Sequence, residues 1–310
     1  MTSPPTDVPD TTELSDDDVL AFMSTLSNWG RWGGDDQLGA LNLIGDPERR
    51  AAAALVRSGR SVGCARPLPT EAAEDNPAPV EHRMIGTFED GWGGDRFAIA
   101  SHGHATSHLD ALCHIFWDGR LYNGYPAETV TAGGAMQLGI HHLADGVQGR
   151  GVLLDVPAVA GRPWLERGHA LTPTDLDATA AAHGVSVEPG DILLVRTGRW
   201  VDRETNGPWA HGQAAAGLHA SCLPWLRRHD VAMLGCDGVS DVVPSGFTAM
   251  RLPIHVVTIV AMGVHLLDNL DLDRLATACA AEGRWEFQLT VAPLVLERGT
   301  ASPVNPIATF

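Results

Sequence analysis

The sequence of 310 residues is poor in positive charge, with 21 basic residues against 38 acidic ones and a formal net charge of -17 at pH 7. Phosphate backbones and anionic lipid surfaces are bound by clustered Lys and Arg side chains. We therefore expect neither nucleic acid nor a membrane as a partner. The sequence also lacks any apolar run of about 18 residues, so we expect no membrane-spanning segment.

Cysteine pairs are missing as well. The five cysteines are odd in number, scattered and without a C-x-x-C pair; they are Cys64, Cys113, Cys222, Cys236 and Cys279. This pattern excludes a disulfide framework and fits a reducing compartment. The N-terminal residues have neither a basic region nor an apolar region of the secretory type, so we expect a cytoplasmic protein.

The chain contains no internal repeat and no linker longer than a loop after residue 14. Its hydrophobic content of 44% is that of an ordinary globular protein and allows a sizeable core. We therefore predict a disordered tail over residues 1–14, rich in Pro, Thr and Asp, and a single domain over residues 15–310.

Helices and strands interleave along the chain. The spacing of apolar residues and the capping signals predict helices at 15–27, 46–58, 172–183, 214–228, 252–262 and 272–281. Apolar runs predict strands at 61–67, 83–88, 97–101, 151–156, 190–197, 231–236, 264–267 and 285–296. Some strand pairs have short connections, so the order favours a mixed α/β (α+β) fold, with a mixed β core and outer helices.

One stretch concentrates groups that bind metal ions. Between Ser101 and Gly119 the sequence spaces His104, His108, Asp110 and His114 as H-x-x-x-H-x-D-x-x-x-H. Imidazoles and carboxylates are ligands of borderline divalent metals such as zinc or manganese. Neither a helix nor a strand brings all four side chains to one ion. We therefore predict a bend near His104 and His108, with Asp110 just beyond it. The alternative is a set of solvated or buried polar residues with no ion.

Around this stretch the sequence resembles the cyclase family of metal-dependent hydrolases, which includes kynurenine formamidase and isatin hydrolase. The run H-A-T-S-H-L-D-A-L-C-H is similar to the H-x-G-T-H-x-D-x-P-x-H signature of that family. Weaker similarities follow in order, at residues 29–44, 190–198, 234–245, 252–255, 268–272 and 302–308. The resemblance covers the chain from Trp29 onward and implies a swivelling β/β/α-type core, and dimers or higher homo-oligomers.

The resemblance also assigns roles. It implies that His104, His108 and Asp110 bind the first metal and that His114 transfers protons. Binuclear members add a downstream His and Glu, and His255 and Asp268 stand near those places. Aspartate is shorter than glutamate, so a second ion is left open. His102 is expected to be a hydrogen-bonding neighbour, although a role as a further ligand is conceivable.

A metal with three protein ligands and an open position activates water. We therefore expect a hydrolase acting on an amide, formamide, lactam or ester bond of a small, cyclic or aromatic molecule. A metal-assisted lyase on a polyketide-like substrate could use the same ligands. A non-catalytic metal-binding protein is less favoured, because structural zinc sites have closed ligand sets.

Three further residues have two interpretations each. Cys113 lies inside the motif, but a small buried hydrophobe is the commoner role. Asp237, at the end of a predicted strand, is a site residue or the cap of the next turn. Trp29 belongs to the core or to a lid over an aromatic substrate.

Overall fold

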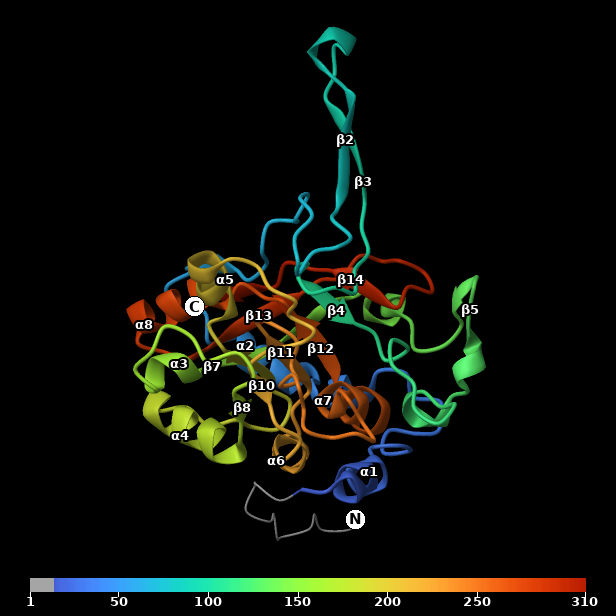
Figure 1. The fold of residues 1–310 in the computed structure, drawn as a ribbon, viewed down its shortest axis with the longest axis vertical. Coiled ribbons are helices and arrows are strands. Elements are labelled where there is room, and N and C mark those ends of the chain that lie inside the picture. The colour runs from blue at the N-terminus through green and yellow to red at the C-terminus, as the bar shows by residue number, and fades with distance from the viewer. Residues whose placement is uncertain (1–13) are drawn as a thin grey trace.

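The computed structural model describes residues 14–310, built around a nine-stranded mixed sheet in the order β1-β15-β13-β7-β9-β11-β12-β4-β14 (Figure 1). The four central strands run parallel; they are β7 (Val147–Asp155), β9 (Ile192–Arg196), β11 (Met233–Cys236) and β12 (His265–Asp268). The flanking strands are antiparallel; they are β1 (Ser61–Gly63), β15 (Ile307–Thr309), β13 (Glu286–Val291), β4 (His108–Asp110) and β14 (Ala301–Pro303). The predicted mixed α/β fold is confirmed.

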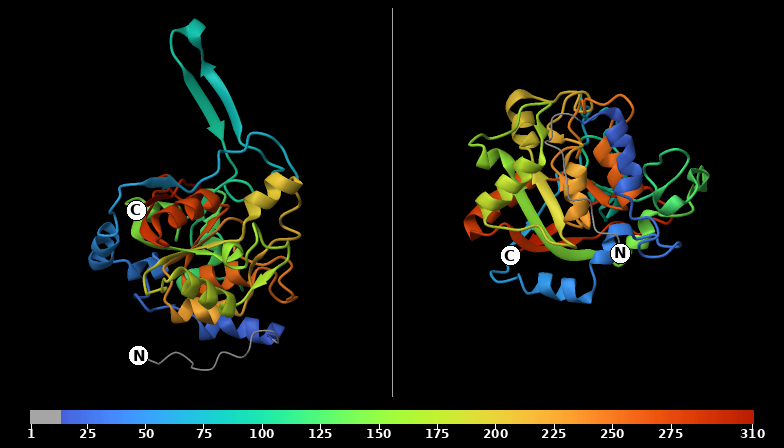
Figure 2. Two further views of the ribbon diagram at one scale, coloured as in Figure 1. Left: turned by 90° about the vertical axis from the view of Figure 1, so that its left-hand side faces the viewer. Right: turned by 90° about the horizontal axis from the view of Figure 1, so that it is seen from below.

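Helices lie around this sheet (Figures 1 and 2). The α-helices are α1 (Asp16–Thr25), α2 (Asp46–Ala53), α3 (Val156–Val159), α4 (Pro173–His183), α5 (Arg199–Asn206), α6 (Cys222–Arg228), α7 (Pro253–Val256) and α8 (Leu272–Glu282). A π-helix, η6 (Val257–Met262), continues α7, and short 3-10 turns include η1 (Gly39–Leu43) and η2 (Phe88–Asp90). None of the helices in the described part of the chain is long and apolar enough to cross a membrane.

Helix boundaries follow the capping signals. The Ser15 side chain accepts a hydrogen bond from the Asp18 backbone, and Asp18 returns one to the Ser15 backbone, which starts α1 as predicted. Thr172 and Asp175 form the same box at the start of α4. Gly184 ends α4 in the left-handed conformation, at φ 65°.

The predicted apolar strands form the centre of the sheet. Every residue of β9 is buried, as expected for a parallel strand covered on both faces. The strand at 231–236 and the helices at 252–262 and 272–281 are also present within a few residues.

Other boundaries differ from the prediction. The predicted helix at 214–228 begins only at Cys222, because Gly217 and Leu218 form β10, which pairs with β8 (Ala170–Leu171). The predicted strand at 285–296 ends at Val291, because Pro293 follows and cannot donate to a strand ladder. The sequence signals missed α5, β14 and β15 altogether.

Two small ribbons lie outside the main sheet. β5 (Val130–Thr131) pairs with β6 (Gly134–Ala135). β2 (Glu81–Gly86) pairs with β3 (Gly94–Ala98) in a hairpin that projects from the body (Figures 1 and 2). Apart from Leu14, the predicted tail lies outside the described residues.

Candidate metal centre

The metal-type motif lies at the carboxyl end of the parallel strands. β4 inserts between β12 and β14, with His108 opposite Asp268 and Asp110 opposite Ala301. In open α/β sheets ligands bind beyond the carboxyl ends of the strands. The register therefore brings two distant parts of the sequence, residues 108–110 and Asp268, to one place.

A bend before β4 is held by Asn269, the residue that follows β12. The Asn269 side chain donates to the carbonyl oxygens of Gly103 at 2.7 Å and Thr106 at 3.0 Å. Ser107 Oγ donates to the Asn269 carbonyl oxygen at 2.7 Å. The turn predicted between His104 and His108 thus depends on an asparagine about 160 residues further along the chain, and local composition gave no signal for it.

Asp110 is the centre of a first group of possible ligands, with His102 and His108. His102 Nδ1 lies 3.0 Å and His108 Nε2 lies 3.4 Å from Asp110 Oδ1. His108 Nδ1 donates to the Thr106 carbonyl oxygen at 2.9 Å, if protonated there, which leaves Nε2 free to coordinate.

Asp110 also belongs to a second group, with His255 and Asp268. His255 Nε2 lies 3.2 Å from Asp268 Oδ2 and 4.0 Å from Asp110 Oδ2. The other ring nitrogen of His255 lies 2.6 Å from Asp241 Oδ2. Such a carboxylate fixes the tautomer and orientation of a ligating histidine, and the sequence prediction did not include Asp241.

The donor atoms fit a divalent ion. Asp110 and Asp268 are 1% and 3% exposed, yet no described residue donates a well-oriented hydrogen bond to either oxygen of Asp110 or to Asp268 Oδ1. Buried carboxylate oxygens are costly unless they are hydrogen-bonded, paired or bound to a metal. Two buried carboxylates and imidazole nitrogens within 4.8 Å of one another therefore favour a cation among them.

The pKa values of the neighbouring histidines also indicate that the buried carboxylates favour positive charge beside them. Burial lowers the pKa of His108, but the Asp110 and Asp268 charges outweigh it and raise the pKa to about 9. Burial also disfavours the His255 imidazolium, while Asp268 and Asp241 raise its pKa well above the usual value. Without an ion, protons on these two histidines balance the buried carboxylates.

His114 lies beside both groups without belonging to either. Its Nε2 is 3.9 Å from Asp110 Oδ2, and its ring stacks on His102 with centroids 3.6 Å apart. Burial lowers the pKa of His114 to about 4, against the opposing effect of Asp110. Its side chain is 24% exposed, so a substrate can reach it more easily than His108 or His255, whose side chains are 3% and 6% exposed.

His104 takes a different place from that of its neighbours in the motif. Its ring lies 5.6 Å from the ring of His211 and packs on Gly212, outside both groups of possible ligands in the described residues. His102 stands beside Asp110 instead. The structure thus brings together four predicted site residues (His108, Asp110, His255 and Asp268), with His114 next to them, while the assignment of His104 as a ligand stays a prediction.

The residues with two interpretations are placed as follows. Cys113 is 1% exposed and burial raises the pKa of its thiol to about 12, which fits a small hydrophobe. Asp237 is buried and accepts hydrogen bonds from the backbones of Thr197, Gly198 and Arg199, so it caps the start of α5. The Trp29 indole donates to the Val260 carbonyl oxygen in η6.

His104 of the motif lines a pocket of about 770 Å³. Leu252, at the start of the helix that carries His255, lines it, and so does Val239, two residues before Asp241. Its wall is largely apolar, with Val243, Pro244 and Phe247, but it also contains Arg251. The pocket is large enough for a small aromatic molecule.

A family model described as putative cyclase matches residues 42–241. The chain belongs to the cyclase family. A crystal structure described as a novel cyclase is 31% identical and covers 92% of this chain and 99% of its own, with a TM-score of 0.83. The family resemblance in the sequence is therefore confirmed.

More distant structures share the fold. An isatin hydrolase from Labrenzia aggregata, bound to benzyl benzoate, is 20% identical over 83% of this chain and 94% of its own, with a TM-score of 0.59. A predicted metal-dependent hydrolase from Bacillus stearothermophilus is 14% identical over 81% of this chain and 98% of its own, with a TM-score of 0.52. No curated protein matches the chain.

Proposed function

We propose that this cyclase-family protein is a metal-dependent hydrolase that cleaves an amide, formamide, lactam or ester bond of a small aromatic or cyclic molecule. One observation carries the proposal. Asp110 is shared by two groups of possible ligands, and no described residue donates a well-oriented hydrogen bond to its buried oxygens. The hydrolase names of two structural neighbours support it.

Each residue has a defined part in this proposal. His108, Asp110, His255 and Asp268 hold zinc or manganese, and His102 or His104 completes the set. The bound ion supplies Lewis acidity for the attack of water on a carbonyl carbon. His114 Nε2 lies 3.9 Å from Asp110 Oδ2 and its side chain is partly exposed, so His114 would take the proton from water and pass it to the leaving group.

The pocket beside His104 is the proposed substrate site. Among the described residues that line it, Arg251 is the one formally charged side chain, and no carboxylate of residues 14–310 forms an ion pair with it. Arginine recognises carboxylates through paired hydrogen bonds. We therefore propose that the substrate carries an acidic group next to its aromatic or cyclic part.

The test is the metal content of the purified protein, measured beside His108→Ala and a control, His169→Ala, whose side chain is exposed. We expect about one or two equivalents of zinc or manganese in the wild type and the control, and a clear loss in His108→Ala. No bound metal, and no gain of thermal stability on adding either ion, contradicts the proposal.

Activity is then screened on formamides, lactams, lactones and esters in water enriched in oxygen-18. A hydrolase places one oxygen from water in the acid product. A lyase that removes water or closes a ring leaves its product unlabelled. An unlabelled product therefore contradicts the proposed hydrolysis and favours the lyase alternative.

A further inference from the structure

Arg199, the first residue of α5, is a buried arginine beside the candidate metal centre. It is 4% exposed and reaches the loop before β4 in two ways. One guanidinium nitrogen donates to the carbonyl oxygen of His104, and another donates to Oδ1 of Asn269. The Asn269 amide nitrogen in turn donates to the carbonyl oxygens of Gly103 and Thr106. Arg199 therefore contacts both the loop and the side chain that holds the loop.

The contact with Asn269 also determines which way the amide group of Asn269 points. A guanidinium group only donates hydrogen bonds, whereas an amide accepts through its oxygen and donates through its nitrogen. Because Arg199 occupies the oxygen, the nitrogen faces the loop. The Thr106 carbonyl oxygen, which accepts from this nitrogen, also lies 2.9 Å from His108 Nδ1. The series of contacts from Arg199 thus ends at the ring of a proposed metal ligand.

Asp75 anchors Arg199. Its side chain is 0% exposed, and its Oδ2 lies 3.2 Å from Arg199 Nη2. Within residues 14–310, Asp75 is the one carboxylate that forms an ion pair with Arg199. Arg203, one turn later in α5, donates to both oxygens of Asp75, at 2.6 and 2.9 Å. One buried carboxylate therefore joins two arginines of the same helix, and only the first of them reaches the loop.

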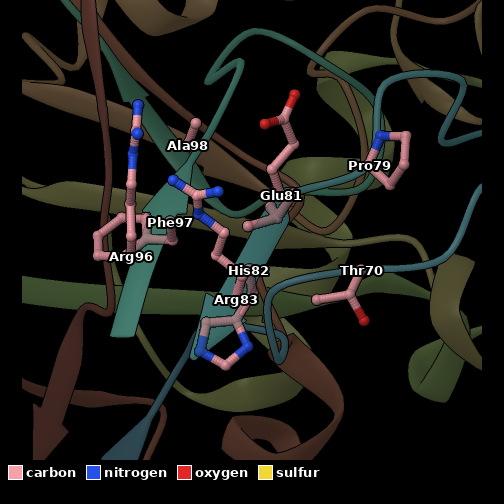
Figure 3. A pocket seen from close by; sticks show the side chains of 9 residues that line it. Thr70, Pro79, Glu81, His82, Arg83, Arg96, Phe97 and Ala98 are labelled. Carbon is pink, nitrogen blue, oxygen red and sulfur yellow. The ribbon is translucent and has the colours of Figure 1, made fainter. Parts of the chain in front are cut away.

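Asp75 belongs to a closed segment at the root of the β2–β3 hairpin. The Val80 backbone donates to the Pro69 carbonyl oxygen at 2.8 Å, which ties the two ends of the segment together. Figure 3 shows Thr70 and Pro79, next to these ends, at a pocket of about 580 Å³ beside the two strands. The backbone that carries Asp75 is therefore held at both ends.

We propose that Arg199 is a positioning residue of the metal centre, anchored by Asp75 and acting through Asn269 on the loop that precedes β4. The inference rests on the proposed function, because it assigns to Arg199 the placing of His108 for an ion. Stability alone does not require this charge, since apolar replacements of buried ion pairs are often neutral or stabilising. A planar guanidinium with five donors can bind the loop, the amide and the carboxylate at the same time.

Arg199→Lys tests this geometry. Lysine keeps the charge beside Asp75, but it is a point charge on a flexible stem and cannot bind all three partners at once. Affinity for zinc and manganese is measured by competition with a chelator. We expect it to fall about 10- to 100-fold, the usual effect of losing an outer contact of a metal ligand. The visible spectrum of cobalt bound in place of zinc reports ligand geometry, and we expect its bands to shift.

Arg203→Lys is the matched control. Arg203 lies on the same helix and binds the same carboxylate, but none of its hydrogen bonds in the described part of the chain reaches the loop before β4. We expect this variant to keep the metal affinity and the cobalt spectrum of the wild type. Urea unfolding of the metal-depleted proteins shows that both variants are folded. Equal metal affinity and equal spectra in the two variants overturn the proposal.

Asp75→Asn tests the anchor. If Asp75 and Arg199 act in one series, each single variant lowers the metal affinity, and Asp75→Asn with Arg199→Lys loses little more than the larger single loss. Contacting residues that act through one network are not additive. Losses that add in full, or an Asp75→Asn variant with unchanged affinity, overturn the part assigned to Asp75.

A measurement without metal separates this inference from the proposed function. Amide hydrogen exchange of metal-depleted protein is followed by mass spectrometry in peptides that contain residues 103–113. We expect faster exchange there in Arg199→Lys than in the wild type or in Arg203→Lys. A wild type that binds no metal contradicts the proposed function, and the exchange rates then still decide whether Arg199 orders the loop. Unchanged exchange in Arg199→Lys overturns the inference, whatever the metal content.

Discussion

In the proposed function, Arg251 is the residue that gives the pocket its preference for an acidic substrate. It lies one turn before His255 along the chain, in a pocket wall that is otherwise apolar or uncharged apart from His104. A charge-assisted hydrogen bond contributes about 1.5–3 kcal/mol. An acidic substrate group bound there is therefore worth roughly 10- to 100-fold in affinity.

We predict that Arg251→Gln lowers kcat/KM for an acidic substrate but leaves that for its neutral analogue unchanged. The matched compounds are N-formylanthranilate and formanilide, which differ by one carboxylate. The expected loss is about 10- to 100-fold for the first compound only. Arg228→Gln, at an exposed position of α6, is the control. An equal loss for both compounds means that Arg251 supports the fold of the pocket instead.

For single residues, the sequence predicted much of the candidate metal centre. His108, Asp110, His255 and Asp268 were all singled out, and the structure brings them together. The sequence took His104 as a ligand and His102 as a neighbour from the resemblance alone, because the direction of each ring depends on a loop held by Asn269. Asp241 was missed for a similar reason: its contact with His255 exists only after the chain has folded.

Among the elements, the π-helix η6 connects the metal centre with the N-terminal part of the chain. Gly263 follows it at φ 67°, a conformation that costs a residue with a side chain about 1–2 kcal/mol. A Cβ atom at Gly263 would also lie 2.4 Å from the ring of Tyr122. The Gly263 carbonyl oxygen accepts a hydrogen bond from the Ala40 backbone at 2.7 Å.

Gly263→Ala is predicted to lower the free energy of unfolding by about 2–4 kcal/mol, from strain and overpacking together. The control is Gly283→Ala at the end of α8, where φ is 64° but nothing lies within 4 Å of the added Cβ. We expect the control to lose only the cost of the left-handed conformation, about 1–2 kcal/mol. Urea unfolding at constant pH measures both changes, and equal losses would show that Tyr122 moves aside without cost.

Elements with local signals were predictable. The capped helices α1 and α4 and the fully buried strand β9 needed only their own residues. The strands β10 and β14 were missed because each is two or three residues long and exists through its partner. Such strands carry no periodicity of their own.

In the molecule as a whole, a buried histidine makes stability depend on pH. His265, in β12, is 2% exposed, and burial lowers its pKa to about 4 against the opposing charges of Asp110 and Asp36. The unfolded chain has a histidine pKa near 6.5. The folded state therefore prefers neutral His265, and the stabilisation is present above about pH 6.5 and lost as the pH falls through 4.

We predict that His265→Gln flattens this acid dependence. Between pH 7.5 and 4.5 the wild type should lose about 2 kcal/mol more stability than the variant. The measurement is urea unfolding of metal-depleted protein at both pH values. A variant that loses as much stability as the wild type would assign the acid sensitivity to other groups.

The sheet order also sets when the candidate metal centre can assemble during synthesis. β4 carries the motif, but its neighbours in the sheet, β12 and β14, come much later in the sequence. Asp110 stays without its paired strand until Ala301–Pro303 has emerged, and Asp268 comes little earlier. The histidines and carboxylates of the motif are therefore brought to their partners only after β12 and β14 have been made.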